Sequence, residues 1–342
     1  MKILKFLLFP FSVVYGCVMA FRNSLYDLGL KKAHSINGKS ILIGNLSMGG
    51  TGKSPHSLYL WELLKDEFSV SFLSRGYGRK TKGLREVATT DTTEDVGDEP
   101  LMFKKRVGNN SVVVVSENRK NGVAYIREKA KNSVIILDDA YQHRKVKAGF
   151  SILLTDFNRP YYNDFVVPTG TLREFRCGKN RADCIIVTKC PQLSESEKNT
   201  IIKNLNAGTK NVYFSEIKYG ELISFSNTKN EDFDNVLLVT GIANPTPLLE
   251  HLQANYHVEL IRFKDHHQFE PNDITFIHEK FDTFAHNGKG VIITTEKDFV
   301  RLAHATFETA INNFPWYYQP IAIQLDREED FKNEVLKYVR TI

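Results

Sequence analysis

The residues best placed for chemistry form a glycine-rich segment, GNLSMGGTGKS, at positions 44–54. A short apolar run leads directly into it, and Pro55, a residue well suited to a first helical turn, follows it. A strand, a glycine-rich turn, Lys-Ser and a helix occur in this order in a P-loop, where backbone N–H groups and the helix N-terminus bind phosphates. In such a loop Lys53 reaches the β- and γ-phosphates of ATP and the Ser54 hydroxyl binds Mg²⁺. The predicted ATP-binding residues are Ser47, Met48, Gly49, Gly50, Thr51, Gly52, Lys53 and Ser54.

One position departs from the strict P-loop pattern G-x-x-x-x-G-K-[ST], because this chain has Ser47 where the pattern has glycine. The Gly49-Gly50 pair supplies the conformational freedom that the loop needs. The segment also resembles the variant found in partition ATPases, but those proteins carry a second lysine where this chain has Met48. A glycine-rich turn without a ligand is the alternative, and the strand–turn–helix context disfavours it.

A second acidic site follows another apolar run. Residues 133–137, SVIIL, precede Asp138 and Asp139, which is the arrangement of a Walker B strand that holds Mg²⁺. Two adjacent aspartates after a strand also suit the cap of a following element. A P-loop upstream favours metal binding, and either carboxylate is a candidate for the direct ligand.

These residues need a framework to position them, and short apolar runs that alternate with helical patterns predict βαβ units and a mostly parallel sheet. The expected fold class is α/β, with a P-loop NTPase core over residues 37–225 and a smaller C-terminal α/β lobe over residues 226–342. A polar, irregular stretch near residues 219–234 marks the boundary. The predicted strands are residues 40–43, 70–73, 112–115, 134–137, 152–154, 184–187, 236–240, 258–263, 291–294 and 320–324, and the predicted C-terminal helices are residues 247–253, 274–281 and 328–339.

Residues 1–36 form a separate N-terminal segment. Its run of uncharged, mostly apolar residues, 6–21, is shorter than the ~20 residues that a spanning helix needs, and it contains Pro10. Three interpretations compete: a signal peptide cleaved near Ala20, a buried core helix, and an amphipathic helix in the membrane interface. The interfacial helix is favoured, because a signal peptide would export an ATP site that belongs in the cytosol. The basic residues expected to face lipid phosphates are Lys2, Lys5, Arg22, Lys31 and Lys32.

The overall composition adds two constraints. A net charge of +5 gives no indication of a nucleic-acid partner, and no obligate protein partner is evident. The four cysteines, which form no C-x-x-C pair and have no zinc-like spacing, are typical of reduced thiols in a cytosolic protein. They are Cys17, Cys177, Cys184 and Cys190.

Eight motifs in order give the chain a resemblance to the tetraacyldisaccharide 4'-kinase family, the lipid A 4'-kinases. The motifs are YDLGL at 26–30, the glycine-rich segment at 44–54, SRGYG at 74–78, GDEP at 97–100, DDAYQHR at 138–144, LRE at 172–174, DHH at 265–267 and TEKD at 295–298. The departures are small: Ser54 stands for the commoner threonine, Ala140-Tyr141 for Gly-Phe, and Phe175 for proline.

The resemblance implies transfer of the γ-phosphoryl group of ATP to the 4'-hydroxyl of an acylated disaccharide 1-phosphate, which forms lipid IVA in lipid A biosynthesis. It implies Mg²⁺ as the cofactor and a glycolipid and the membrane surface as partners. It also implies a membrane-facing N-terminal helix on a peripheral protein of the cytoplasmic face of the inner membrane.

The resemblance also assigns roles that the residues alone do not suggest. Asp98 by itself is typical of a turn or cap acid, and His266 of a surface histidine. As family members they become the base for the acceptor hydroxyl and the histidine that orients it, next to the catalytic Lys53. The predicted substrate-binding residues are Arg75, Arg119, Gln142, His143 and Arg173, and Glu174 is predicted as a third acidic group near Mg²⁺ beside Ser54, Asp138 and Asp139.

A regulatory P-loop ATPase or GTPase at the membrane is the main alternative. A GTPase usually shows N-K-x-D, and the nearest segments, 188–190 and 295–298, lack the asparagine. A small-metabolite kinase would leave the apolar, basic N-terminus unexplained. ATP turnover that depends on a lipid disaccharide separates these classes, because a regulator hydrolyses ATP without it.

Overall fold

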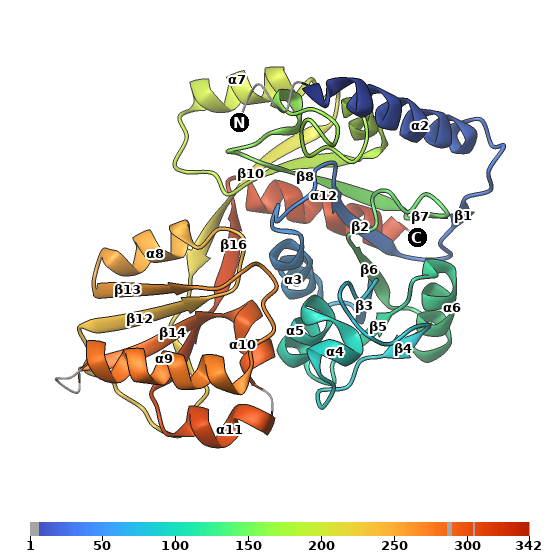
Figure 1. Ribbon diagram of the computed structural model, residues 1–342. Coiled ribbons are helices and arrows are strands. Elements are labelled where there is room, and N and C mark those ends of the chain that lie inside the picture. Colours follow the sequence, from blue (N-terminus) through green and yellow to red (C-terminus); the bar gives the residue numbers. More distant parts are fainter. Residues whose placement is uncertain (1–6, 286–288, 304, 342) are drawn as a thin grey trace.

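The computed structural model describes residues 7–285, 289–303 and 305–341, and it forms two α/β lobes with an N-terminal helix along the larger one (Figure 1). Lys2 and Lys5 of the predicted basic N-terminus lie outside the described residues. The prediction of an α/β fold with mostly parallel sheets is confirmed.

The large lobe is built on a nine-stranded sheet in the order β16-β10-β9-β8-β2-β6-β3-β5-β4. The strands from β10 to β5 in this order run parallel, and β16 and β4 add antiparallel edges. Their bounds are β2 Ser40–Asn45, β3 Val70–Ser74, β4 Arg85–Glu86, β5 Val112–Val115, β6 Val134–Asp138, β8 Phe150–Asp156, β9 Cys184–Thr188, β10 Asn211–Tyr219 and β16 Ile321–Leu325.

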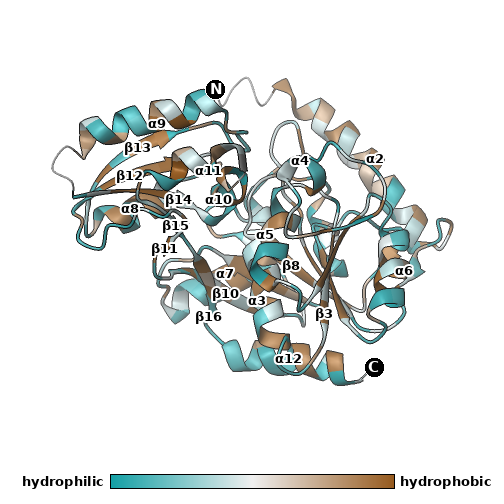
Figure 2. Cartoon of the chain, turned by 90° about the horizontal axis from the view of Figure 1, so that it is seen from below, coloured by the Kyte–Doolittle hydropathy of each residue, from teal (hydrophilic) through white to brown (hydrophobic). Residues whose placement is uncertain are grey.

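Helices cover both faces of this sheet, which explains why β2 and β6 are buried along their whole length and contain the apolar runs 41–43 and 134–137. One face packs against α3 (Lys53–Leu64), α5 (Asp98–Val107) and α12 (Glu328–Thr341). The other face packs against α6 (Arg119–Lys129) and α7 (Glu195–Leu205). Figure 2 shows the hydrophobic strands enclosed between helices whose outer surfaces are more hydrophilic. The short helix α4 (Thr93–Val96) precedes α5, and the 3₁₀ turns η1 (Tyr161–Asn163) and η2 (Arg176–Arg181) lie between β8 and β9.

The smaller lobe has a five-stranded sheet in the order β11-β15-β14-β12-β13. Helix α8 covers one face of it, and α9 and α11 cover the other. The bounds are β11 Ile223–Ser224, β12 Asn235–Thr240, β13 His257–Arg262, β14 Gly290–Thr295, β15 Trp316–Gln319, α8 Thr246–Gln253, α9 Pro271–Phe284, α10 Glu296–Leu302 and α11 Ala305–Asn312.

The chain returns to the large lobe after this second sheet. β15 ends at Gln319, and β16 begins two residues later as the antiparallel neighbour of β10. Residues 321–341, which the sequence assigned to the C-terminal lobe of residues 226–342, therefore lie on the large sheet. Sequence periodicity identified the strand and helix in this segment, but strand pairing over a long separation has no local signal.

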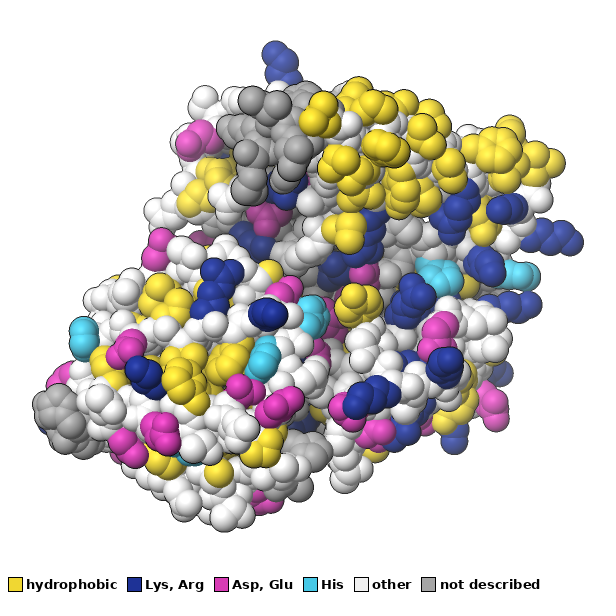
Figure 3. All heavy atoms as spheres, in the orientation of Figure 1, with side chains coloured by type: hydrophobic (Ala, Val, Ile, Leu, Met, Phe, Trp, Pro, Cys, Tyr) yellow, Lys and Arg dark blue, Asp and Glu magenta, His cyan; other side chains and the backbone are white. Residues whose placement is uncertain are grey.

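Helix α2 (Phe9–Asp27) is the first element of the described structure, with Pro10 in its first turn, where a missing N–H costs nothing. Apolar side chains form a continuous surface over α2, with Lys and Arg side chains near its edge (Figure 3). Among the residues that the structure describes, no helix has both the length and the apolar character to cross a bilayer. A two-stranded sheet of β1 (His34–Ser35) and β7 (Val146–Lys147) connects the segment after α2 to the large lobe. The exposed apolar residues of α2 are Phe9, Phe11, Val13, Val14, Tyr15, Val18 and Phe21.

Candidate active site

The glycine-rich loop, residues 46–52, joins β2 to α3 at the carboxyl edge of the large sheet. Gly52 immediately precedes α3 with φ of +84°, a left-handed conformation that glycine adopts without strain. The Asn45 amide closes the loop by donating to the Thr51 hydroxyl at 2.8 Å. Lys53 and Ser54 then occupy the buried first turn of α3, where the free N–H groups of a helix favour an anion.

Residues 171–173, in the connection between β8 and β9, support this loop through the main chain. The Met48 N–H donates to the Thr171 carbonyl at 2.7 Å, and the Arg173 N–H donates to the Leu46 carbonyl at 2.7 Å. Ser47 pairs with Leu172 between these two bonds. The Met48 side chain, at the same place in the loop, is 56% exposed to solvent.

Two side chains that the sequence analysis did not assign also hold the loop. The Lys189 ammonium donates to the Gly50 carbonyl and forms an ion pair with Asp156 at 2.6 Å. His56 contacts the Gly52 carbonyl through Nδ1 at 2.7 Å. Burial lowers the pKa of His56 to about 4, so the ring is neutral at physiological pH. The sequence feature that could have identified Lys189 is its position directly after a buried strand, β9.

The acidic pair, Asp138 and Asp139, ends β6 next to the loop. Asp138 is fully buried; its Oδ1 accepts from Ser57 at 3.0 Å, and its Oδ2 has no hydrogen-bond partner among the residues that the structure describes. Burial raises the pKa of Asp138, and the nearby carboxylates of Glu99 and Asp139 add to the effect. Asp139 is partly exposed and lies 3.8 Å from the Lys53 ammonium. Glu99 was not assigned from the sequence, although it directly follows Asp98.

Arg173 and Gln142 extend this polar surface. The Arg173 guanidinium contacts Asp139 Oδ1 at 3.1 Å and donates to Gln142 Oε1 at 3.3 Å. The Gln142 amide donates to the Asn45 carbonyl, at the start of the glycine-rich loop, at 2.8 Å. The predicted lysine, acidic pair, glutamine and arginine therefore lie together.

Asp98 begins α5 one residue after Gly97, whose φ is +91° and whose Cβ, if present, would lie 2.8 Å from the Tyr77 carbonyl. Two side chains of the C-terminal lobe reach it. His266 Nδ1 lies 3.0 Å from Asp98 Oδ2, and Arg301 donates to the same oxygen from Nε at 3.1 Å and also from Nη2.

Charge keeps this carboxylate ionised. Burial alone would raise the pKa of Asp98, but the hydrogen bonds from His266 and Arg301, with the charge of Arg301, lower it to about 2. Arg301 is itself buried, and its Nη1 donates to Asp298 Oδ1 at 2.7 Å. His266 has a left-handed backbone, φ +59°, which its N–H bond to the Gly241 carbonyl at 3.1 Å helps to hold.

Two further ion pairs join α5 to α10. Arg106 lies 3.2 Å from Glu296, and Lys297 lies 3.5 Å from Glu99. The TEKD segment thus faces the large lobe, and the Asp98 contacts lie in the same interface between the lobes.

A model of the family described as tetraacyldisaccharide-1-P 4'-kinase matches residues 4–340. The chain belongs to this family. A tetraacyldisaccharide 4'-kinase of Flavobacterium psychrophilum is 42% identical over 100% of this chain and 98% of its own length. Another, from Bacteroides thetaiotaomicron, is 39% identical over 97% of this chain and 93% of its own length.

A solved structure of this family has the same fold. The LpxK of Aquifex aeolicus, crystallised in complex with ATP, superposes with a TM-score of 0.75 at 28% identity and covers 98% of this chain and 99% of its own. This chain thus transfers the γ-phosphoryl group of ATP to the 4'-hydroxyl of a tetraacyldisaccharide 1-phosphate in lipid A biosynthesis. The family and activity predicted from the motifs are confirmed, and the regulatory ATPase is not favoured.

The remaining predicted substrate residues of this kinase differ in accessibility. Arg119 is only 1% exposed, and its guanidinium donates to the Ser116 carbonyl and, at 3.5 Å, to the Asp138 carbonyl behind the acidic pair. Burial lowers the pKa of Arg119 to about 10, which leaves it cationic. Burial and the positive charges of Arg119 and Arg75 lower the pKa of His143.

Glu174 differs from its predicted role as a third metal ligand of the kinase. It is 2% exposed, and Arg181 donates to Oε2 at 2.9 Å and to Oε1 at 2.8 Å. The Asn23 amide on α2 donates to Oε2 at 2.7 Å, and the Gln142 amide donates to Oε1 at 3.1 Å. Both carboxylate oxygens are therefore occupied by side chains, and Glu174 connects α2 to the site.

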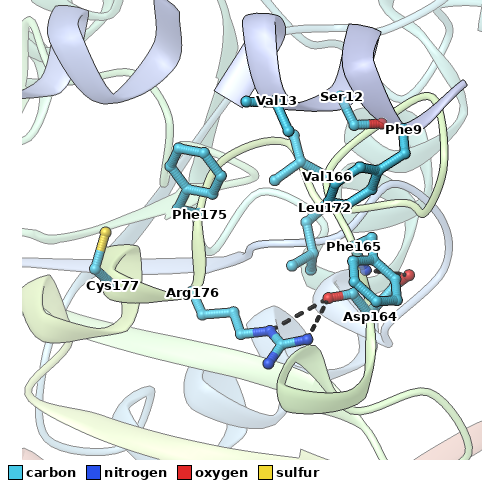
Figure 4. A pocket seen from close by; sticks show the side chains of 10 residues that line it. All are labelled: Phe9, Ser12, Val13, Asp164, Phe165, Val166, Leu172, Phe175, Arg176 and Cys177. Carbon is cyan, nitrogen blue, oxygen red and sulfur yellow. Dashed lines mark hydrogen bonds between the residues drawn. The ribbon is translucent and has the colours of Figure 1, made fainter. Parts of the chain in front are cut away.

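An apolar cavity of about 510 Å³ lies between α2 and the loops that follow β8 (Figure 4). Phe9 and Val13 of α2 form one wall, opposite Leu172 and Phe175. The Arg176 guanidinium closes one end by donating to the Asp164 carbonyl at 2.9 Å.

Proposed function

We propose that the kinase reaction takes place between the two lobes, with the glycine-rich loop acting as a P-loop for ATP and Asp98 as the base for the 4'-hydroxyl. The observation that carries this proposal is the convergence of His266 and Arg301, from the C-terminal lobe, on Asp98 of the large lobe. Asp98 adjoins Glu99, whose charge acts on the buried Asp138. The acceptor base and the phosphate-binding residues thus belong to one continuous site.

Asp98 is suited to accept a proton late in the reaction. His266 and Arg301 contact Oδ2, and among the described residues no donor contacts Oδ1, so this oxygen is available to the acceptor hydroxyl. A sugar hydroxyl is a weak nucleophile, and phosphoryl transfer passes through a loose transition state. The base therefore takes the proton as the new oxygen–phosphorus bond forms, when that proton is most acidic. His266 orients the carboxylate through the contact of its Nδ1 with Oδ2.

The acidic pair fits Mg²⁺. Mg²⁺ prefers oxygen ligands, keeps several waters and binds through one or two carboxylates and the nucleotide phosphates. The buried Oδ2 of Asp138, which no described residue contacts by a hydrogen bond, provides one such carboxylate, with the Ser54 hydroxyl and Asp139 close to the same loop. Within the described ranges no three acidic, histidine or cysteine side chains are preassembled as a cage, which accords with a cation that arrives with ATP. When bound, Mg²⁺ offsets the negative charge of the phosphates, and Lys53 adds a positive charge from the protein.

The acceptor is proposed to bind along Arg173, Gln142 and His143. Arg173 can meet a phosphate with a planar pair of N–H groups, which suits it better than lysine. Arg75 and Arg119 supply positive charge nearby, and the buried Nε of Arg119 has no hydrogen-bond partner in the described structure.

The kinase is proposed to bind peripherally to the cytoplasmic face of the inner membrane through α2. The exposed apolar side chains of this helix would lie among lipid acyl chains. Lys31 and Lys32 follow the helix, are exposed and would meet anionic headgroups. Arg22, which the sequence also predicted to face lipid phosphates, instead donates to the Gln142 carbonyl at 3.2 Å.

The test uses ATP, Mg²⁺ and a lipid disaccharide 1-phosphate, with the product analysed by mass spectrometry. We expect a mass gain of one phosphate and ATP turnover that requires the lipid. Asp98→Asn and His266→Ala should lower kcat strongly, while His267→Ala is the matched control, because His267 pairs with Asp273 at 2.8 Å instead. Lipid-independent ATP hydrolysis, or full activity in Asp98→Asn, would contradict the proposal.

A further inference from the structure

The strap, residues 169–175, lies between α2 and the glycine-rich loop. On one side its main chain pairs with the loop at Thr171 and Arg173, as described above. On its other side it contacts α2 at three points spread over the helix. The strap thus connects the N-terminal helix to the phosphate-binding loop.

The first two contacts are close and buried. The Ser12 hydroxyl, on a residue only 3% exposed, donates to the Thr169 hydroxyl at 2.7 Å and accepts from the Thr169 N–H at 2.9 Å. Gly16 faces the Phe175 ring so closely that a Cβ at Gly16 would lie 2.4 Å from it. Figure 4 shows Ser12 and Val13 directed from α2 toward this part of the chain.

The third contact is polar and leads into the site. Asn23, one residue beyond Arg22 on α2, donates to Glu174, which Arg181 and Gln142 also hold. Gln142 accepts from Arg173, Arg173 pairs with Asp139, and Asp139 lies beside Lys53. Polar side chains therefore form an unbroken series from the helix to the P-loop lysine.

A helix that served only as a membrane anchor would need an apolar outer surface and no more. Burying Ser12 and the charge of Glu174 carries a desolvation cost that their hydrogen bonds must offset. These buried polar groups fix the helix in one position and register against the strap, which apolar contacts alone do not do.

We propose that Ser12, Asn23 and Glu174 are positioning residues for phosphoryl transfer: through the strap they set the geometry of Arg173, Asp139 and the glycine-rich loop according to how α2 lies. The inference rests on the proposed function, because it assigns these residues to the same P-loop and acceptor site. It gives α2 a role in the chemical step in addition to any attachment to lipid.

The experiment compares Ser12→Ala and Asn23→Ala with Ser24→Ala in the full-length kinase. Ser24 lies on the same helix, is exposed and donates to the Ala20 carbonyl, so it controls for loss of a serine hydroxyl from α2. Each variant is assayed for binding to anionic phospholipid vesicles, for KM of ATP and for kcat at saturating lipid acceptor. Circular dichroism verifies the fold.

We expect unchanged vesicle binding in all three variants. Loss of one neutral hydrogen bond should lower kcat roughly two- to tenfold in Ser12→Ala, and loss of a bond to a buried carboxylate roughly 10- to 100-fold in Asn23→Ala. Ser24→Ala should match the wild type. Asn23→Ala and Gln142→Ala should also be non-additive in kcat, since both act through Glu174.

Wild-type kcat in folded Ser12→Ala and Asn23→Ala, or loss of vesicle binding that accounts for their defects, would overturn the inference. Strict additivity of Asn23→Ala with Gln142→Ala would do the same. A wild-type protein that transfers no phosphate to the lipid would instead contradict the proposed function, so the two failures are distinguishable.

Discussion

Replacing Arg301 by glutamine should move the pH dependence of catalysis, because Arg301 supplies much of the positive charge around Asp98. A pKa lowered from 3.8 to about 2 corresponds to about 2 kcal/mol in favour of the ionised carboxylate. The groups that produce it are His266, Arg301 and Lys297, working against burial. Without Arg301 fewer groups oppose the effect of burial, and the pKa of Asp98 rises.

The sign of the effect follows from which form of Asp98 is active. In the wild type Asp98 stays ionised until the pH falls toward about 2, so it imposes no acid limit on activity near neutrality. In Arg301→Gln the protonated fraction grows as the pH falls below the raised pKa, and a protonated carboxylate cannot act as the base. The buried charges of Asp98 and Asp298 also lose a partner, which should destabilise the fold by about 3 to 5 kcal/mol.

The assay is kcat/KM for the lipid acceptor between pH 4.5 and 8, expressed as the ratio of variant to wild type. Titration of Asp138 affects both proteins and largely cancels in this ratio. We expect the ratio to fall with decreasing pH in Arg301→Gln and to stay flatter in Arg301→Lys, which keeps the charge. Arg106→Gln, which breaks only the pair with Glu296, is the control. A ratio for Arg301→Gln that does not change with pH would refute this account of Asp98.

Three further predictions concern the proposed roles. Lys53→Ala and Ser54→Ala should reduce phosphoryl transfer by orders of magnitude while thermal unfolding shows a folded protein, and near-normal turnover in Lys53→Ala would exclude the P-loop assignment. Asp98→Ala and His266→Ala should each lower kcat with little change in KM for ATP, and the double variant should lose far less than the product of the single losses, because the two act as a unit. Deleting residues 2–21 should release the kinase to the soluble fraction and raise KM for lipid more than KM for ATP, and high salt should weaken membrane binding of the intact chain only partly; a deleted protein that still pellets with membranes would argue against the interfacial helix.

Local patterns predicted the central strands and the loop well. β5 has the predicted bounds, Val112–Val115, because a continuous apolar run flanked by turn residues leaves little choice. β10, Asn211–Tyr219, was not predicted, since its second half alternates with polar residues at the edge of the core. Its pairing with β16 joins segments about a hundred residues apart, which no local period reveals.

The residues of the candidate site also differ in whether a local pattern or only the folded chain identifies them. Lys53 and Ser54 could be predicted because they belong to a contiguous motif, in which the geometry of the loop itself sets the spacing of the residues. Arg301 lies 203 residues from Asp98, and its only local signal is its position three residues after Asp298, on the same face of a helix. Glu174 was predicted as a third acidic group near Mg²⁺, but the sequence could not show that Arg181 pairs with it.

The return of the chain to the large sheet has a consequence for biosynthesis on the ribosome. β16 and α12 are made after the entire smaller lobe, yet Phe331 and Val335 of α12 are buried in the core of the large one. Until they emerge, β10 presents an unpaired edge and one face of the sheet lacks the part of its cover that α12 supplies, and such a surface promotes aggregation. A nascent chain halted after residue 320 should therefore bind chaperones. Premature termination within the last strand and helix should abolish kinase activity as completely as the loss of an active-site residue.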